Sequence, residues 1–135
     1  EASKAAGKIM KNRGEGRIIN IASVAGLVPL QLQCAYSAAK AGVVNLTQAM
    51  AVELGGAGIL VNAIAPGSTL TEGTKRLLYR EDGTFHDKAQ AMLAHVSLGR
   101  PGTTDEIAVA AQFLADPENT YMNGHVLTVD GGMVM

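Results

Sequence analysis

The stretch YSAAKAGVVNLTQAMAVEL at residues 36–54 and the run ILVNAIAPG at residues 59–67 decide the fold of this chain. Apolar residues recur at helical spacing in the first stretch, which predicts a helix over Ala35–Leu54 that ends at a group of glycines. Its predicted inner face consists of Ala39, Val43, Leu46, Met50 and Leu54. The second run is almost entirely apolar, so it predicts a buried strand over Ile59–Ala65.

Further helices and strands alternate on both sides of this pair. Residues 1–11 read as the end of a helix, and Arg17–Ser23 (RIINIAS) as a strand buried on both faces. Downstream we expect a helix over Thr103–Ala115 that begins with a capping box, and a strand over Val126–Val129. Strands separated by helices pair in parallel. The sequence therefore predicts an α/β fold with a doubly wound parallel sheet, of which three strands with flanking helices are present.

The composition argues against several classes of protein. With 47% hydrophobic and 17% charged residues among 135, the chain is typical of a globular domain. A net charge of −1 without a basic tract gives no indication of nucleic acid or a membrane as partner, and the apolar runs are short. The single cysteine, Cys34, excludes an internal disulfide and indicates a reducing, cytoplasmic compartment. His86 and His95 are interpreted as solvated surface residues, so no metal site is predicted.

Three polar residues are predicted to converge on one edge of the sheet. Tyr36 and Lys40 lie four apart on one helix face, and Ser23 ends the preceding strand. Ligands of open parallel sheets bind beyond the carboxyl ends of strands, where the Pro66–Gly67 turn also falls. A phenol can pass a proton to a carbonyl oxygen, a nearby ammonium favours the phenolate, and a hydroxyl can hold the carbonyl. No side chain supplies a hydride, so this chemistry points to a nicotinamide cofactor.

Each of these residues also has a purely structural interpretation. A tyrosine and a lysine at this spacing occur often by chance, and Ser23 alone suits a cap at the end of a strand. Judged by their spacing alone, these three residues are more often structural than catalytic. Cys34 precedes Tyr36, but no base is placed beside it, so a small packed residue is favoured over a nucleophile.

Taken together, the motifs over Gly16–Gly132 resemble those of the short-chain dehydrogenase/reductase family. They are GRIINIASVAG (16–26), YSAAK (36–40), GILVNAIAPG (58–67), LGRPGTTDEIA (98–108) and NGHVLTVDGG (123–132). A YxxxK with a serine thirteen residues before the tyrosine, followed by VNxxxPG and VDGG, is highly specific as a set. The resemblance implies a Rossmann-type fold and an NAD- or NADP-dependent oxidoreductase that interconverts a secondary alcohol and a ketone.

The resemblance also implies catalytic roles for three residues. Tyr36 is the expected general acid/base, and Ser23 is expected to orient the substrate carbonyl. Lys40 is expected to bind the nicotinamide ribose and to stabilise the phenolate of Tyr36, which itself lies against the cofactor. Asn62 and Asp130 also match motif positions, but both are interpreted as structural.

Further positions match residues that contact the cofactor or the substrate in the family. Pro66 and Gly67 are expected to flank the nicotinamide ring. Thr69 and Thr71 are expected to contact its carboxamide, the first through its backbone and the second through its hydroxyl. Gln33 stands at a position often near substrate, although a polar residue at the start of a helix is an equally good interpretation.

The glycine-rich turn T-G-x-x-x-G-x-G of the family, which holds the cofactor pyrophosphate, has no counterpart in these 135 residues. Residues 1–135 are therefore expected to be the C-terminal portion of a single Rossmann domain. This portion needs its missing N-terminal dinucleotide-binding half and is expected to be inactive alone. The family's active-site asparagine and the residue that selects NAD or NADP belong to that half.

Among members of the family, the pattern most resembles 3-oxoacyl-[acyl-carrier-protein] reductases and sugar or polyol dehydrogenases such as gluconate 5-dehydrogenase. The expected substrate is a small-molecule alcohol or ketone of either kind, beneath a lid formed by residues of about 70–98. A homo-oligomer, specifically a tetramer, is expected, with Val126–Val134 packing across an interface. The alternative class is a catalytically incompetent module that serves only in folding or oligomerisation.

Overall fold

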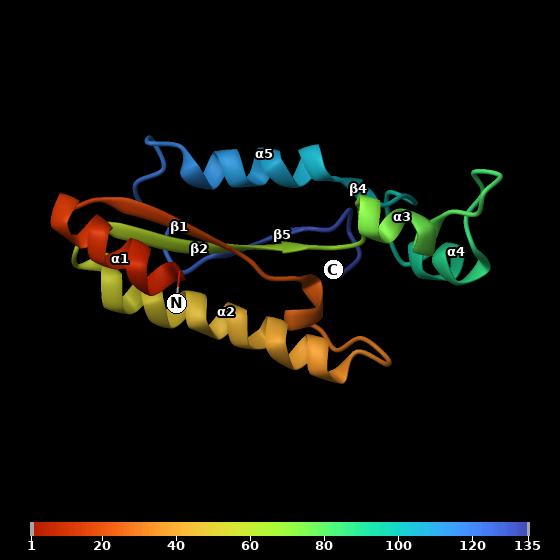
Figure 1. The fold of residues 1–135 in the computed structure, drawn as a ribbon, viewed down its shortest axis with the longest axis horizontal. Helices are drawn as coiled ribbons and strands as arrows, with labels where there is room; N and C mark the ends of the chain where they lie inside the picture. The colour runs from red at the N-terminus through yellow and green to blue at the C-terminus, as the bar shows by residue number, and fades with distance from the viewer. Residues whose placement is uncertain (1, 135) are drawn as a thin grey trace.

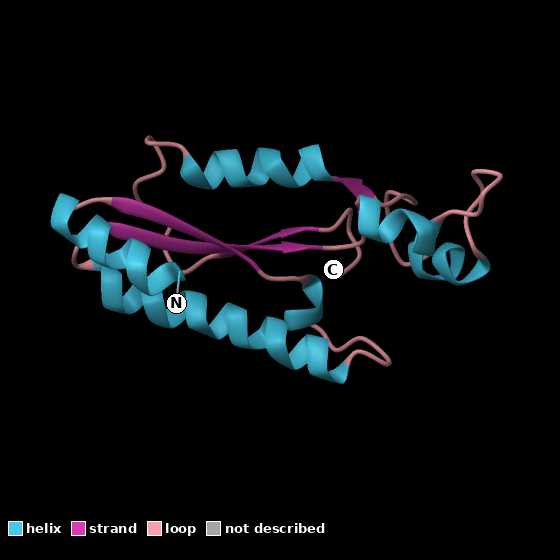
Figure 2. Cartoon of the chain, viewed as in Figure 1, coloured by secondary structure: helices cyan, strands magenta, loops and turns pink. Residues whose placement is uncertain are grey.

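A computed structural model describes residues 2–134 of the chain (Figures 1 and 2). Three strands form a parallel sheet in the order β1 (Gly16–Ile21), β2 (Ile59–Pro66) and β5 (Val126–Val129). The helices α1 (Ala2–Arg13) and α2 (Cys34–Gly55) cover one face of this sheet, and α5 (Thr104–Ala115) covers the other (Figure 1). The predicted α/β fold, a doubly wound parallel sheet of three strands with flanking helices, is confirmed.

The central strand β2 is apolar except for Asn62, because helices cover both of its faces. Successive residues of a strand point to opposite sides, so each face of β2 needs its own apolar neighbours. The cluster toward α1 and α2 contains Ile18, Ala51, Ile59 and Val61, and the cluster toward α5 contains Ile64, Ala110 and Leu114. All of these side chains are buried.

The prediction that Arg17–Ser23 is a strand buried on both faces is confirmed only in part: Ile18 and Ile19 pack into the two core clusters, but most of the strand is only half-buried. Within residues 2–134, β1 pairs only with β2, so its other edge is open. Ile18 is its one buried residue, and Ile21 is 51% exposed. The strand also ends at Ile21, and Ser23 instead begins the short 3-10 helix η1 (Val24–Gly26). An apolar run indicates a strand, but its burial depends on a neighbouring strand that the run does not specify.

The helix α2 lies within one residue of its predicted bounds at each end, but its predicted inner face is partly wrong. Ala39 and Leu46 are exposed, while Thr47 is fully buried. The Thr47 hydroxyl donates to the Val43 carbonyl oxygen at 2.8 Å and accepts from Asn20 Nδ2 at 2.9 Å. Because α2 is apolar on nearly all sides, hydrophobicity alone does not identify the side that packs.

Although α2 is long, no helix in residues 2–134 is both long and apolar enough to cross a membrane.

The polar segment between β2 and α5 forms a small subdomain beyond the carboxyl end of β2 (Figure 1). The segment contains two short helices, α3 (Glu72–Leu78) and α4 (Asp87–Leu93). A second parallel pair, β3 (Thr69–Leu70) with β4 (Gly102–Thr103), ties this subdomain to the start of α5 (Figure 2). Strands of two residues are too short to show any periodicity, so the sequence did not predict them.

Candidate active site

A cavity of about 680 Å³ lies where β1 and β2 end and α3 and α4 begin. Its volume falls within the range of about 300–1,000 Å³ that is usual for small-molecule sites. The lining includes every residue that the sequence singled out for the site, namely Ser23, Gln33, Tyr36, Lys40, Pro66, Gly67, Thr69 and Thr71. Residues from separate helices, strands and loops of the chain therefore meet in one cavity.

Tyr36 and Lys40 come from the first turns of α2. The Nζ atom of Lys40 lies 5.8 Å from the centroid of the Tyr36 ring. The same ammonium donates to the carbonyl oxygen of Ile21 at 2.9 Å, which ties it to the end of β1. The Tyr36 side chain is 47% exposed and lines the cavity. The phenol is thus both beside a cation and accessible to a small molecule.

Ser23 is buried and has a structural contact of its own. Its Oγ atom accepts a hydrogen bond from the backbone N–H of Ala25 at 3.2 Å and so caps η1, as the structural interpretation expects. The hydroxyl proton is still free to be donated toward the cavity, because a serine donates one bond and can accept two. The turn packs directly on α2, since a Cβ atom on Gly26 would lie 2.7 Å from the backbone carbonyl carbon of Lys40. This close approach positions Ser23 against the Tyr36–Lys40 helix.

The loop after β2 carries Gly67, Thr69 and Thr71, which the resemblance predicts to contact the cofactor. The Gly67 N–H donates to the Val129 carbonyl oxygen at 3.0 Å, and a Cβ atom on Gly67 would lie 2.7 Å from Cβ of Asp130. The Thr69 hydroxyl donates to the Gly67 carbonyl oxygen at 3.2 Å. The Thr71 hydroxyl accepts from the backbone N–H of Thr74 at 3.1 Å and caps α3. Sequence reasoning missed this cap, because a capping box usually has Glu or Gln where Thr74 stands.

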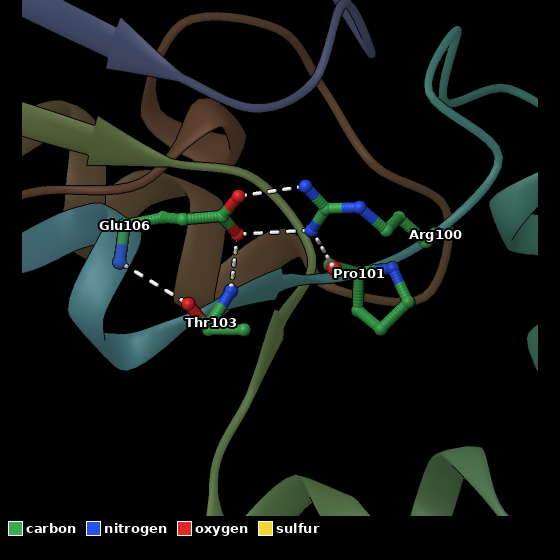
Figure 3. Close-up of polar contacts among 4 residues, drawn as sticks. All are labelled: Arg100, Pro101, Thr103 and Glu106. Carbon is green, nitrogen blue, oxygen red and sulfur yellow. Dashed lines mark hydrogen bonds and ion pairs between the residues drawn. The ribbon is translucent and has the colours of Figure 1, made fainter.

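A cluster around Glu106 holds β4, the neighbour of this loop (Figure 3). Its carboxylate accepts from Arg100 Nη2 at 2.6 Å, from Arg100 Nη1 at 2.9 Å and from the Thr103 backbone N–H at 2.8 Å. The Glu106 N–H in turn donates to the Thr103 hydroxyl at 3.2 Å, which confirms the predicted capping box. The hydrogen bonds from Arg100 and then from Thr103 lower the pKa of Glu106 to about 2. No pattern in the sequence predicted that Arg100 would bond to Glu106.

Three other residues considered in the sequence analysis do not line the cavity. The Asn62 side chain donates to the Met122 carbonyl oxygen at 2.8 Å, and the Asp130 carboxylate accepts from the Gly132 N–H at 3.0 Å, so both have the predicted structural roles. Cys34 is exposed, so its interpretation as a packed residue is wrong. It begins α2 at a point where neighbouring elements do not cover it.

Comparison with known proteins places these residues in context. Residues 1–134 match a family described as enoyl-(acyl carrier protein) reductase. The chain is 43% identical over 134 residues to a 3-oxoacyl-[acyl-carrier-protein] reductase of Synechocystis sp., covering 98% of the chain and 50% of that protein. It is 41% identical over 133 residues to galactitol 2-dehydrogenase (L-tagatose-forming) of Cereibacter sphaeroides, covering 97% of the chain and 50% of that protein.

Solved structures give a consistent result. The crystal structure of a gluconate 5-dehydrogenase from Burkholderia cenocepacia J2315, in complex with NADP and tartrate, matches with a TM-score of 0.87 and 34% identity. That match covers 97% of this chain and 49% of the other. The chain thus spans about half the length of the curated relatives it matches.

Proposed function

Because this chain belongs to the short-chain dehydrogenase/reductase family and has its Rossmann-type fold, we propose that it forms part of an NAD- or NADP-dependent oxidoreductase. The proposed reaction interconverts a secondary alcohol and a ketone. The observation that carries the proposal is that Ser23, Tyr36 and Lys40 line one cavity at the carboxyl ends of parallel strands. Open α/β sheets bind their ligands at this edge.

Ser23, Tyr36 and Lys40 have separate roles in the transfer of one proton to the substrate. In the direction of reduction, the phenol of Tyr36 donates its proton to the carbonyl oxygen. Ser23 donates a hydrogen bond to the same oxygen and holds it beside the phenol. Lys40, which the Ile21 carbonyl holds near the ring, favours the phenolate that remains. A bound nicotinamide supplies the hydride that this chemistry requires.

The cavity fits the nicotinamide end of such a cofactor. An ammonium and several hydroxyls stand beside the backbone of the loop after β2, and these groups suit a ribose and a carboxamide. The residues proposed to hold this end are Tyr36, Lys40, Pro66, Gly67, Thr69 and Thr71. The turn T-G-x-x-x-G-x-G is absent from the sequence, so we propose that an N-terminal half binds the pyrophosphate. That half would also pair with the open edge of β1.

The substrate is proposed to be a 3-oxoacyl thioester or a sugar-type alcohol, the two kinds named for the relatives. Gln33 lines the cavity and is proposed to contact this substrate beneath the lid of residues 70–98. A homo-oligomer, specifically a tetramer, is proposed. The support is apolar surface on the outer sides of α2 and α5, where Val52 is 85% and Val109 is 66% exposed. The exposed thiol of Cys34 suits the reducing conditions of the cytoplasm, where we place the protein.

The test is Tyr36→Phe in the full-length protein, with Tyr121→Phe as the matched control because Tyr121 is fully exposed. Oxidation of NADH and NADPH is followed with ketones of both classes. We expect Tyr36→Phe to lower kcat by about 10²-fold or more and Tyr121→Phe to leave it unchanged. Activity of Tyr36→Phe within about threefold of wild type would refute the role of the phenol.

The competing explanation is a module that serves only in folding or oligomerisation. It predicts that the wild-type protein turns over no alcohol or ketone with either cofactor. The same assay on the isolated 135-residue chain tests the need for an N-terminal half. We expect that chain to show neither tight NAD(P) binding nor turnover, and activity without a partner would contradict this.

A further inference from the structure

Besides Thr71 and Thr74 at the start of α3, the lid contributes five residues to the cavity lining, which we term the lid wall: Leu77, Leu78, Lys88, Ala89 and Met92. Leu78 and Ala89 are buried against the subdomain, but Leu77 is 72% exposed and Met92 is 37% exposed. Two large apolar side chains of this wall therefore remain open to the cavity. A ligand with an apolar surface would cover them and remove that surface from water, which favours its binding.

The charges around the cavity have one sign. Lys40 and Lys88 are its charged lining residues, and no Asp or Glu lines it within the described part of the chain. Lys40 is held by the Ile21 carbonyl oxygen. Lys88 makes no hydrogen bond or ion pair with any residue among 2–134, and the carboxylate next to it, Asp87, is paired with Arg80 at 2.6 Å. Lys88 is thus an exposed cation at the cavity that is paired with no carboxylate among residues 2–134.

The cation and part of the apolar surface of the lid wall lie side by side. Lys88 and Met92 are four residues apart on α4, so they share one face of the helix. An apolar contact and a cation are therefore presented together to whatever enters. A molecule that matches both has a hydrocarbon body and an anionic group.

Resting on the function proposed above, we infer that the substrate is an anionic ketone with an apolar body. Its carbonyl is held by Ser23 and Tyr36, its hydrocarbon part covers Leu77 and Met92, and its anionic group pairs with Lys88. A neutral polyol fits the lid wall poorly, because each of its hydroxyls needs a hydrogen-bond partner when it is buried. Lys88 is the one polar side chain of this wall, and the hydroxyls of the other polar lid residues in the lining, Thr71 and Thr74, bond to each other and to each other's backbone N–H. Lys88 is accordingly a specificity-determining residue.

The experiment uses the full-length protein and a series of straight-chain oxocarboxylates of increasing length, each beside its neutral methyl ester. The ratio of kcat/KM for the acid to that for the ester measures recognition of the charge. We expect wild type to prefer the acid at the best length by up to about fivefold, because an ion pair to an exposed lysine contributes at most about 1 kcal/mol. Lys88→Met retains the apolar stem of the side chain and should bring the ratio to about one, whereas Lys88→Arg should preserve the preference.

Lys75→Met is the matched control, because Lys75 is an exposed lysine of α3 that does not line the cavity. It should leave the ratio at the wild-type value. An unchanged ratio in Lys88→Met, or no preference for acids in wild type while esters are reduced, would overturn the inference alone. A raised KM for NAD(P)H in Lys88→Met at constant ratio would assign the lysine to the cofactor and also overturn it. Failure of wild type to reduce any acid or ester, while it reduces a 3-oxoacyl thioester or a sugar ketone, would also overturn the inference alone, whereas failure with all of these ketones would count against the proposed function itself.

Discussion

The two walls of the cavity are built in different ways. The proposed catalytic residues Ser23, Tyr36 and Lys40 form one wall, which we term the catalytic wall. Ser23 caps η1, and Tyr36 and Lys40 lie on α2, a helix of 22 residues that packs against the sheet. The lid wall rests on α3 and α4, helices of seven residues each. The subdomain that carries them is joined to the rest of the molecule through β3–β4 and through hydrogen bonds such as that from the Leu98 N–H to the Gly131 carbonyl oxygen, at 3.1 Å. Long packed elements suit groups that must be positioned accurately, whereas short ones tolerate change, so the first wall should govern turnover and the second substrate choice.

The largest effect is expected when the catalytic wall loses its cation. Lys40→Met should lower kcat/KM by about 10²-fold or more and weaken cofactor binding, because the ammonium is proposed to serve both the phenol and the ribose. Steady-state kinetics and fluorescence titration with NADPH and NADH measure the two effects. The matching change in the lid, Lys75→Met, should alter neither. If Lys40→Met left both quantities at their wild-type values, the division between the walls would lose its main support.

The next effect tests how tightly the catalytic wall is packed. In Gly26→Ala the new methyl group would lie 2.7 Å from the backbone of Lys40, so η1 has to move away from α2. We expect a loss of about 1–3 kcal/mol in the free energy of unfolding, together with a lower kcat as Ser23 is displaced. Gly42→Ala is the control, because a Cβ there meets nothing within 4 Å. It should be neutral or stabilise the helix by up to about 1 kcal/mol, as urea denaturation of both variants would show.

A smaller effect, dependent on pH, is expected at the junction between the two walls. The pKa of Glu106 is lowered from 4.5 to about 2 in the folded protein by the bonds from Arg100 and Thr103. A lowered carboxyl pKa stabilises the folded state at pH values above 4.5, and this stabilisation is lost as the pH falls from there to about 2. Wild type should therefore be more stable than Glu106→Gln at neutral pH, and the difference should shrink through that window. Urea unfolding at several pH values measures this, and a difference that stayed constant down to pH 3 would contradict it.

The smallest effect is expected at the tip of the lid. Arg80 and Asp87 approach to 2.6 Å, but their side chains are 41% and 90% exposed. Exposed ion pairs contribute little, so Arg80→Ala should change the free energy of unfolding by no more than about 0.5 kcal/mol. It should also leave kcat/KM unchanged, because neither residue lines the cavity. A loss well above 1 kcal/mol in thermal or urea unfolding would mean that the lid is more firmly built than its short helices indicate.

Local patterns in the sequence were sufficient for most elements and for part of the site. Helical spacing predicted α2 to within one residue at each end, and the spacing of Thr103 and Glu106 predicted the cap of α5. The residues singled out around Tyr36 and Lys40 all line one cavity, although their catalytic roles stay predictions. These successes share a cause, since each depends on residues close together in the chain or on motifs matched as a set.

Other features depended on residues far apart in the sequence. The buried Thr47 of α2 and the contact of Gly26 with the Lys40 backbone follow from which elements become neighbours. The sequence did not indicate that the exposed apolar residues Leu77 and Met92 line the same cavity as Tyr36. By itself, therefore, the sequence determined the type and order of the elements and which side chains could take part in the proposed reaction. Only the tertiary structure decided what each residue faces, because packing between distant segments, and not spacing along the chain, sets burial and neighbours.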